Sequence, residues 1–159
     1  MKIGIIVYSQ TGNTLQVAEQ LKAALLETGH EAALEQITAQ QEQTKEGITV
    51  NLTHAPDASV YDMVYFAAPV QAFSLCPVMK RYLATMQDFG GRRAALLTTQ
   101  QLPKTWMGGK RAIRQMGQAV ASKGGTVLAS GIVNWSAKDR DARIRQVVAE
   151  LATASPVQV

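Results

Sequence analysis

Hydrophobic and polar positions change along the chain in blocks that predict strands separated by helices. Five apolar runs have the length of buried strands: Lys2–Ser9, Ala32–Ile37, Met63–Ala68, Ala94–Thr99 and Thr126–Val133. Between most of them, apolar residues recur at the spacing of one helical face. This order predicts βαβ units, and therefore an α/β fold in which a parallel sheet carries helices on both faces.

The segments between the strands carry signals for the beginning and end of helices. The first predicted helix, Leu15–Glu27, is followed by Gly29, a residue type that commonly ends helices. Pro77 is placed to open the second helix, because proline suits the first turn. Apolar residues at helical spacing mark the other two helices: Ile113, Met116 and Val120 in one, and Ile144, Val147, Val148 and Leu151 in the other.

The link between the second and third strands departs from this pattern. The stretch Thr38–Asp62 lacks a helical period and contains Gly47 and Pro56. Within it, Ile48–Leu52 alternates between apolar and polar residues, as a short extra strand does. We therefore expect the helix of the second crossover to be shortened or irregular.

Composition and length predict one cytoplasmic domain over residues 1–159. Hydrophobic residues make up 47% and no apolar run approaches the roughly 20 residues that span a bilayer, so we expect no membrane insertion. The N-terminus leads directly into a strand pattern, which is unlike a signal peptide. The single cysteine, Cys76, rules out an internal disulfide and fits a reducing compartment. The formal charge is +4, and the basic residues are scattered along the chain, which argues against nucleic-acid binding.

The turn between the first strand and the first helix has the composition of an anion-binding loop. It is rich in small, hydroxyl-bearing and amide residues: Ser9, Gln10, Thr11, Gly12, Asn13 and Thr14. Backbone N–H groups at the start of a helix point at a bound anion, and the helix dipole favours negative charge there. Glycine lets the backbone approach the ligand, and the hydroxyls add donors. The sequence therefore predicts that this loop holds a phosphate.

Two further loops are expected at the same edge of the sheet, because ligands of open parallel sheets bind at the carboxyl ends of the strands. The third strand is followed by an apolar loop with one aromatic residue: Pro69, Val70, Gln71, Ala72 and Phe73. The fourth strand leads into Thr99, Gln100 and Gln101, and then Trp106. These two loops could enclose a planar heterocycle and offer amide groups to its edge. A phosphorylated planar cofactor is the simplest ligand for the three loops together.

Two of these segments resemble the flavodoxin family. Tyr8–Thr14 is similar to the flavodoxin phosphate loop, Ser/Thr-x-Thr-Gly-Asn-Thr, and Tyr61–Val70 looks like the third strand and flavin loop of that family. The resemblance implies a three-layer flavodoxin-like fold with five parallel strands in the order 2-1-3-4-5 and noncovalently bound FMN. In such a fold Ser9 to Thr14 would cradle the phosphate, and Pro69 to Phe73 would line the isoalloxazine. Thr99 to Gln101 would meet the edge of the ring, and Phe73 or Trp106 would stack on it.

The sequence also departs from the family in two respects. Flavodoxins are typically acidic, whereas this chain has a pI of about 9.4, which puts the usual basic redox partners in question. The family often has a glycine after the third strand, where a peptide flip stabilises the one-electron-reduced flavin. The segment Val70–Ala72 has none, so the flip would cost more here.

The leading functional prediction is an FMN-binding electron-transfer flavoprotein in which no side chain acts as a catalytic acid or base. Its partners would be other redox proteins, and it would be a monomer or a small homo-oligomer. The alternative is an FMN-dependent NAD(P)H:quinone-type oxidoreductase, whose partners would be a nicotinamide and a quinone. A third possibility is a binding module that keeps the fold and has lost the flavin.

Other chemistries fit the sequence poorly. Cys76 precedes Arg81 by one residue less than the Cys-x5-Arg site of low-molecular-weight tyrosine phosphatases requires, and it follows the wrong strand. We therefore expect it to be a core cysteine. His30 and His54 have no Cys or carboxylate at ligand spacing, so we expect both to be solvent-facing or turn residues and we expect no metal site.

Overall fold

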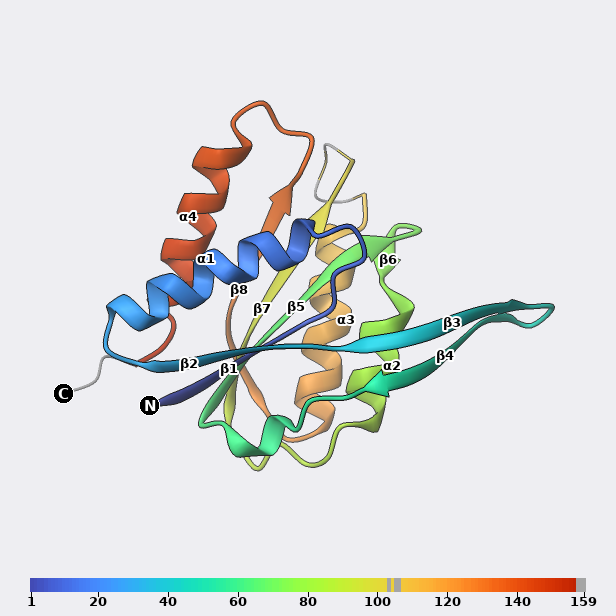
Figure 1. Cartoon of the computed structure of the whole chain (residues 1–159), viewed down its shortest axis with the longest axis horizontal. Helices are drawn as coiled ribbons and strands as arrows, with labels where there is room; N and C mark the ends of the chain where they lie inside the picture. Colours follow the sequence, from blue (N-terminus) through green and yellow to red (C-terminus); the bar gives the residue numbers. More distant parts are fainter. Residues whose placement is uncertain (103, 105–106, 157–159) are drawn as a thin grey trace.

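A parallel five-stranded sheet forms the centre of the computed structural model, which describes residues 1–102, 104 and 107–156 (Figure 1). Its strands are, in spatial order, β2 (Glu31–Gln36), β1 (Lys2–Val7), β5 (Met63–Gln71), β7 (Arg93–Gln100) and β8 (Thr126–Asn134). A short strand β6 (Ser74–Leu75) pairs antiparallel with the end of β5. The predicted order 2-1-3-4-5 is therefore confirmed.

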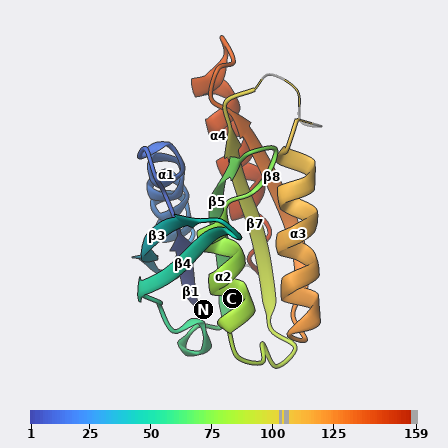
Figure 2. The same cartoon turned by 90° about the vertical axis from the view of Figure 1, so that its right-hand side faces the viewer.

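Helices cover the two faces of the sheet and make three layers (Figures 1 and 2). One face carries α1 (Asn13–Glu27) and α4 (Arg140–Ala152), and the other carries α2 (Pro77–Thr85) and α3 (Gly109–Ser122). Successive strand residues point to opposite faces, so Ile5 packs under α1 and α4 whereas Ile6 packs under α2 and α3. The apolar runs of the central strands are thus buried on both sides.

The second crossover contains a hairpin in place of a helix. Strands β3 (Thr38–Thr44) and β4 (Gly47–His54) pair antiparallel and are followed by the 3₁₀ helix η1 (Ala58–Val60). The irregular crossover and the extra strand at Ile48–Leu52 are therefore confirmed. Ala39, Val50 and Leu52 pack the base of the hairpin against the α2 side of the core, while its tip projects from the body (Figure 1).

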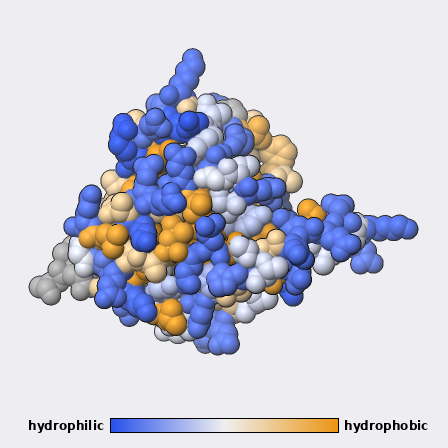
Figure 3. Space-filling model, viewed as in Figure 1, coloured by the Kyte–Doolittle hydropathy of each residue, from blue (hydrophilic) through white to orange (hydrophobic). Residues whose placement is uncertain are grey.

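The surface of this projecting arm is hydrophilic over most of its length (Figure 3). In the turn between β5 and β6, the side chain of Phe73 is 59% exposed. None of the helices that the structure describes is long and apolar enough to span a bilayer.

His30 lies in the interior, directly after the turn that follows α1, so of the two expected settings, solvent or a turn, exposure to solvent is wrong for this residue. It follows α1 and is only 4% exposed, with Nε2 3.1 Å from the hydroxyl of Ser155 near the C-terminus. Its Nδ1 has no partner among the described residues. Burial lowers the pKa of His30, and the positively charged N-terminus adds to this effect. The ring is therefore neutral at pH 7.

We expect His30 to make the fold less stable as the pH falls below the usual histidine pKa of about 6.5. In that range His30 binds a proton in the unfolded chain but not in the folded chain. The free energy of unfolding therefore falls by up to about 1.4 kcal/mol for each pH unit. Urea unfolding of wild type and His30→Gln at about pH 7.5 and about pH 5.5 measures this loss. Between these two pH values the variant should lose less stability than wild type. Equal losses in the two proteins would contradict a role of His30 in the pH dependence.

Candidate functional site

The predicted phosphate loop, Ser9–Thr14, is held in a tight turn by the hydroxyl of Ser9. Its Oγ accepts hydrogen bonds from the backbone N–H of Gly12 at 3.1 Å and of Leu15 at 3.2 Å. Gly12 has φ +93° at the N-cap of α1, in the left-handed region that favours glycine. The sequence Ser-x-x-Gly thus turns the chain from β1 into the helix with no side chain over the loop at Gly12.

The loop retains donors that could bind an anion. The backbone N–H groups of Gln10, Thr11, Asn13 and Thr14 donate to no acceptor within the described part of the chain. The Ser9 hydroxyl accepts two bonds and keeps its own hydrogen to donate. These donors stand at the positive end of a 15-residue helix. The geometry therefore matches an anion-binding loop without a side-chain cation.

A buried pair of hydroxyls joins the phosphate loop to the end of β7. Thr14 Oγ1 lies 2.7 Å from Thr99 Oγ1, and both residues are buried. One hydrogen is used between the two oxygens, so the other remains available to a ligand or a carbonyl. This contact fixes the loop after β1 relative to the loop after β7.

The loop after β5 is a tight two-residue turn that leads into β6. Ala72 has φ +50° and Phe73 has φ +60°, although neither is a glycine. Two successive positive φ values are typical of a type I′ hairpin turn, which normally contains Asn or Gly. Gln71 Nε2 donates to Gln10 Oε1, which connects this turn to the phosphate loop. The turn is therefore strained and holds Phe73 outward at the edge of the site.

The loop after β7 is organised by Gln100, which is 3% exposed. Its Nε2 donates to the carbonyls of Leu102 at 2.5 Å and Lys104 at 2.7 Å. Its Oε1 is buried without a partner among the described residues and points toward Gly109, where a Cβ would lie 2.4 Å away. The side-chain amide of Gln100 thus shapes the loop, which leaves the amide of Gln101 exposed on the surface.

These three loops meet around a hollow of about 150 Å³. It is lined by nine residues, all of which the sequence predicted for the site: Gln10, Thr11, Asn13, Pro69, Val70, Gln71, Thr99, Gln100 and Gln101. A second hollow of about 200 Å³ shares Val70, Gln100 and Gln101 and extends to Ala72 and Phe73. It is also lined by Leu102 and Met107, which the sequence analysis did not select. Trp106, the other predicted stacking residue, lies outside the described residues.

Both hollows are uncharged. No ionisable side chain is found among the described residues that line them. Beside the phosphate loop, the hydroxyl of Tyr8 accepts a hydrogen bond from Gln41 of β3 at 3.2 Å. Burial raises the pKa of Tyr8, so the phenol stays neutral at pH 7. Binding here therefore depends on dipoles, hydrogen bonds and apolar contact.

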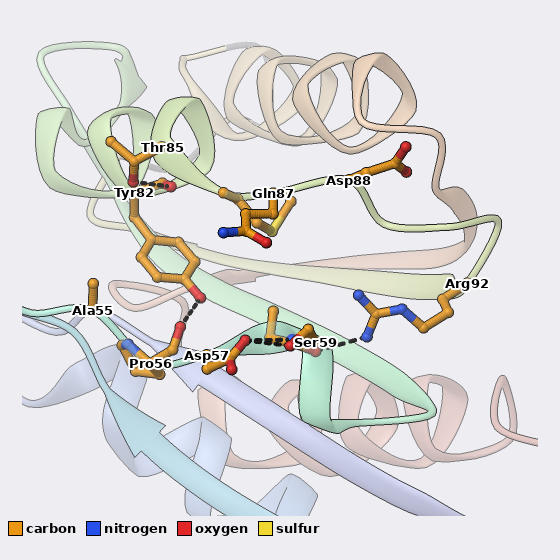
Figure 4. A pocket seen from close by; sticks show the side chains of 11 residues that line it. Ala55, Pro56, Asp57, Ser59, Tyr82, Thr85, Gln87, Asp88 and Arg92 are labelled. Atoms are coloured by element: carbon orange, nitrogen blue, oxygen red, sulfur yellow. Dashed lines mark hydrogen bonds between the residues drawn. The ribbon is translucent and has the colours of Figure 1, made fainter.

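A polar hollow of about 250 Å³ lies at the opposite end of the sheet (Figure 4). Its polar groups bond within the protein: Tyr82 Oη donates to the Pro56 carbonyl at 2.5 Å, and Asp57 accepts from the Ser59 amide at 2.9 Å. Arg92 Nη1 donates to the carbonyls of Ala58 and Tyr61. These bonds fix the return of the chain from the hairpin into β5, which is a structural role.

Cys76 is buried at the N-cap of α2, as expected for a core cysteine. Burial raises the pKa of its thiol to about 11, so the thiol is protonated at neutral pH. A protonated, inaccessible thiol is a poor nucleophile. The residue therefore contributes packing next to the site.

We expect Ala72→Gly to stabilise the protein by about 1 kcal/mol, because glycine removes the cost of a left-handed alanine. The matched control is Ala149→Gly at an exposed position of α4, where glycine should destabilise by about 1 kcal/mol. Urea midpoints of the three proteins measure both effects. Equal losses in the two variants would show that the turn is unstrained.

Known structures share this fold, although sequence comparisons give nothing. No family model and no curated protein matches the chain. Oxidised flavodoxin 1 from Bacillus cereus superposes with a TM-score of 0.73 at 17% identity, over 97% of this chain and 96% of that one. A flavodoxin, WrbA-like protein from Agrobacterium tumefaciens gives 0.64 at 15% identity, over 96% and 95%. A flavoprotein in complex with FMN from Lactobacillus acidophilus gives 0.63 at 14%, over 92% and 97%. The expected flavodoxin-like fold is therefore confirmed.

Proposed function

We propose that this chain, as one domain over residues 1–159, binds FMN noncovalently and carries electrons between redox partner proteins. The observation that carries the proposal is the convergence of an amide-rich phosphate loop with two apolar, amide-bearing loops around shared hollows. The likeness of the fold to flavodoxins, and to a flavoprotein whose structure contains FMN, supports it. The lone buried cysteine fits a reducing compartment, and we place the protein in the cytoplasm.

In this proposal Ser9–Thr14 binds the phosphate of FMN. The free backbone N–H groups of the loop would donate to phosphate oxygens, and hydrogen bonds to charged groups contribute about 1.5–3 kcal/mol each. The Ser9 and Thr11 hydroxyls add donors, and the glycine at position 12 leaves the approach open. The loop would thus stabilise the doubly negative phosphate with backbone N–H groups and hydroxyls, without a lysine or arginine.

The isoalloxazine would lie between Pro69–Phe73 and Thr99–Gln101. Val70, Phe73, Leu102 and Met107 offer apolar contact, and Gln71 and Gln101 offer amides to the polar edge of the ring. Bound FMN supplies electron-transfer and hydride-transfer chemistry, and the protein supplies binding and orientation. The described residues that line the hollows include no ionisable side chain, which supports a role in which the protein binds and orients the flavin and no side chain acts as an acid or base.

The direct test compares FMN with riboflavin, which has the same ring and no phosphate. Titration of the purified protein, followed by quenching of flavin fluorescence, should give at least about 100-fold tighter binding of FMN, or about 2.7 kcal/mol. This difference isolates the contribution of the phosphate loop. Equal affinities would overturn the phosphate assignment, and no binding of either flavin would favour a module that has lost the cofactor.

A second candidate is an FMN-dependent NAD(P)H:quinone-type oxidoreductase. The hollow beside Phe73 is open to solvent, so a second planar substrate could stack there, and one structural neighbour is WrbA-like. Rapid mixing of the FMN-loaded protein with NADPH or NADH separates the candidates. A carrier should keep its flavin absorption under these conditions, whereas a reductase would lose it within the mixing experiment and regain it on addition of a quinone.

A further inference from the structure

The fold gathers on one face several of the basic residues that look scattered along the sequence. The stretch 77–123, which includes α2 and α3, carries nine Lys and Arg residues and a single acid, Asp88. The remaining chain carries the other seven of the 16 basic residues and eleven of the 12 acids. Six of the nine in 77–123 lie on α2, on α3 or at the C-cap of α3: Lys80, Arg81, Lys110, Arg111, Arg114 and Lys123. Neither helix carries an acid, so the α2–α3 face is positive, although the whole chain has a formal charge of only +4.

Most cations of this face do not stabilise the helices that carry them; Lys123, at the C-cap of α3, is the exception, because its Nζ donates to the Ala84 carbonyl. Helix α3 has Lys110, Arg111 and Arg114 in its first turns and no acid along its length. Positive side chains oppose the helix dipole at an N-terminus, and like charges three or four residues apart repel each other. Helix α2 likewise contains Lys80 and Arg81 and no acid. Binding to another molecule therefore explains these charges better than stabilisation of the helices does.

An apolar groove of about 390 Å³ runs between these two helices, which lie side by side in Figure 2. Leu75, Leu83, Ala84 and Ala119 form its apolar surface. Lys80 of α2 and Lys123 at the end of α3 line its sides, and Lys123 Nζ lies 3.4 Å from the Ala84 carbonyl. The apolar surface is recessed between cations.

Two more cations stand one helical turn beyond the groove, on the side of the proposed flavin site. Gln115 and Gln118 line the groove, and Arg111 and Arg114 precede them by four residues on α3. Leu75 belongs to β6, directly after the turn that carries Phe73, and Gly108 packs against the backbone of Phe73. A molecule seated in the groove would thus reach the turn at the edge of the proposed flavin site.

We propose that the groove between α2 and α3 is the docking site for an acidic, amphipathic segment of the redox partner protein. Apolar side chains of that segment would fill the groove, and its carboxylates would face Lys80, Arg111 and Arg114. The proposal rests on the proposed function, because it names the partner of that same electron carrier. A recessed apolar surface favours an inserted protein segment over the flat surface of a membrane.

An NMR titration with a synthetic amphipathic helical peptide of Leu, Ala and Glu tests this docking site on the FMN-loaded protein. Amide shifts should concentrate in α2, β6 and α3. The double variant Lys80→Gln, Arg114→Gln should weaken peptide binding about fivefold to tenfold, as expected for two partly exposed ion pairs. The matched variant Lys138→Gln, Arg145→Gln removes the same charge outside this face and should change affinity less than about twofold.

Three results would overturn the proposal. One is equal weakening by the two double variants, and another is a set of shifts on α1 and α4. The third is tighter binding to phosphatidylserine vesicles than to the peptide, with the same dependence on Lys80 and Arg114, which would assign the face to a membrane surface. Flavin fluorescence is recorded on the same samples. FMN binding without peptide binding overturns the docking site alone, whereas peptide binding without FMN binding overturns the proposed function and the redox role of the groove.

Discussion

Replacing Gly12 with aspartate should weaken FMN binding about 1000-fold while the protein stays folded. A carboxylate beside the phosphate repels it by about 4 kcal/mol per pair of charges at close range, and about 1.4 kcal/mol corresponds to a factor of ten. A Cβ at position 12 meets no atom within 4 Å, so the change causes no collision. Flavin fluorescence quenching measures the affinity.

The matched control for this change is Gly29→Asp at the other end of α1. Gly29 has φ +86°, close to the +93° of Gly12, and a Cβ there also meets nothing within 4 Å. Both variants should therefore carry the same backbone strain of about 1–2 kcal/mol. Only the change at position 12 should affect FMN. If Gly12→Asp bound FMN as tightly as wild type, the phosphate would have to lie elsewhere.

The convergence of the three loops could be predicted from sequence because it depends on topology. Carboxyl ends of parallel strands share one edge of the sheet, so recognising β1, β5 and β7 places Ser9, Pro69 and Thr99 together. The apolar runs of these strands are long enough to be identified without tertiary information. The amide-bearing and hydroxyl-bearing residues that follow them then predicted the lining of the hollow.

The features that sequence reasoning missed depend on distant contacts. His30 is buried in contact with Ser155, which lies 125 residues later in the chain. The residues near His30 in the sequence give no indication of that contact. The stretch Thr38–Thr44 is almost entirely polar, so neither a helical nor a strand period identifies it as part of a hairpin. Leu102 and Met107 line the second hollow. The loop that carries them is held by hydrogen bonds: Gln100 Nε2 donates to the carbonyls of Leu102 and Lys104, and the Met107 N–H donates to the same Lys104 carbonyl.

The charge asymmetry is different, because a signal for it was present in the sequence. Counting charges between successive strands, and not over the whole chain, would have shown nine basic residues against one acid in 77–123. In a doubly wound sheet each crossover covers one face, so a charge imbalance within neighbouring crossovers becomes a charged surface. The formal charge of +4 over the whole chain hides this, since eleven of the 12 acids lie outside 77–123.

Replacing Gly108 with alanine should destabilise the protein by about 3 kcal/mol and disturb the flavin site. A Cβ at this position would lie 2.5 Å from Val70 Cγ1 and 3.0 Å from the backbone of Phe73, so the β5–β6 turn would have to move. Overpacking of this kind costs about 1–3 kcal/mol, and the positive φ of +124° adds about 1–2 kcal/mol. The midpoints of urea unfolding measure the loss of stability, provided that the free energy of unfolding depends on urea with the same slope in both proteins.

Gly47→Ala is the control that separates collision from strain. Gly47 has φ +123°, and a Cβ there meets no atom within 4 Å, so this variant should lose only about 1–2 kcal/mol. FMN affinity should fall about tenfold in Gly108→Ala and stay unchanged in Gly47→Ala, because only the former displaces the turn that carries Phe73. Equal losses of stability in Gly108→Ala and Gly47→Ala would mean that the β5–β6 turn moves away from the new methyl group at no cost. Unchanged FMN affinity in Gly108→Ala would remove Val70 and Phe73 from the flavin site and leave the phosphate loop as its main determinant.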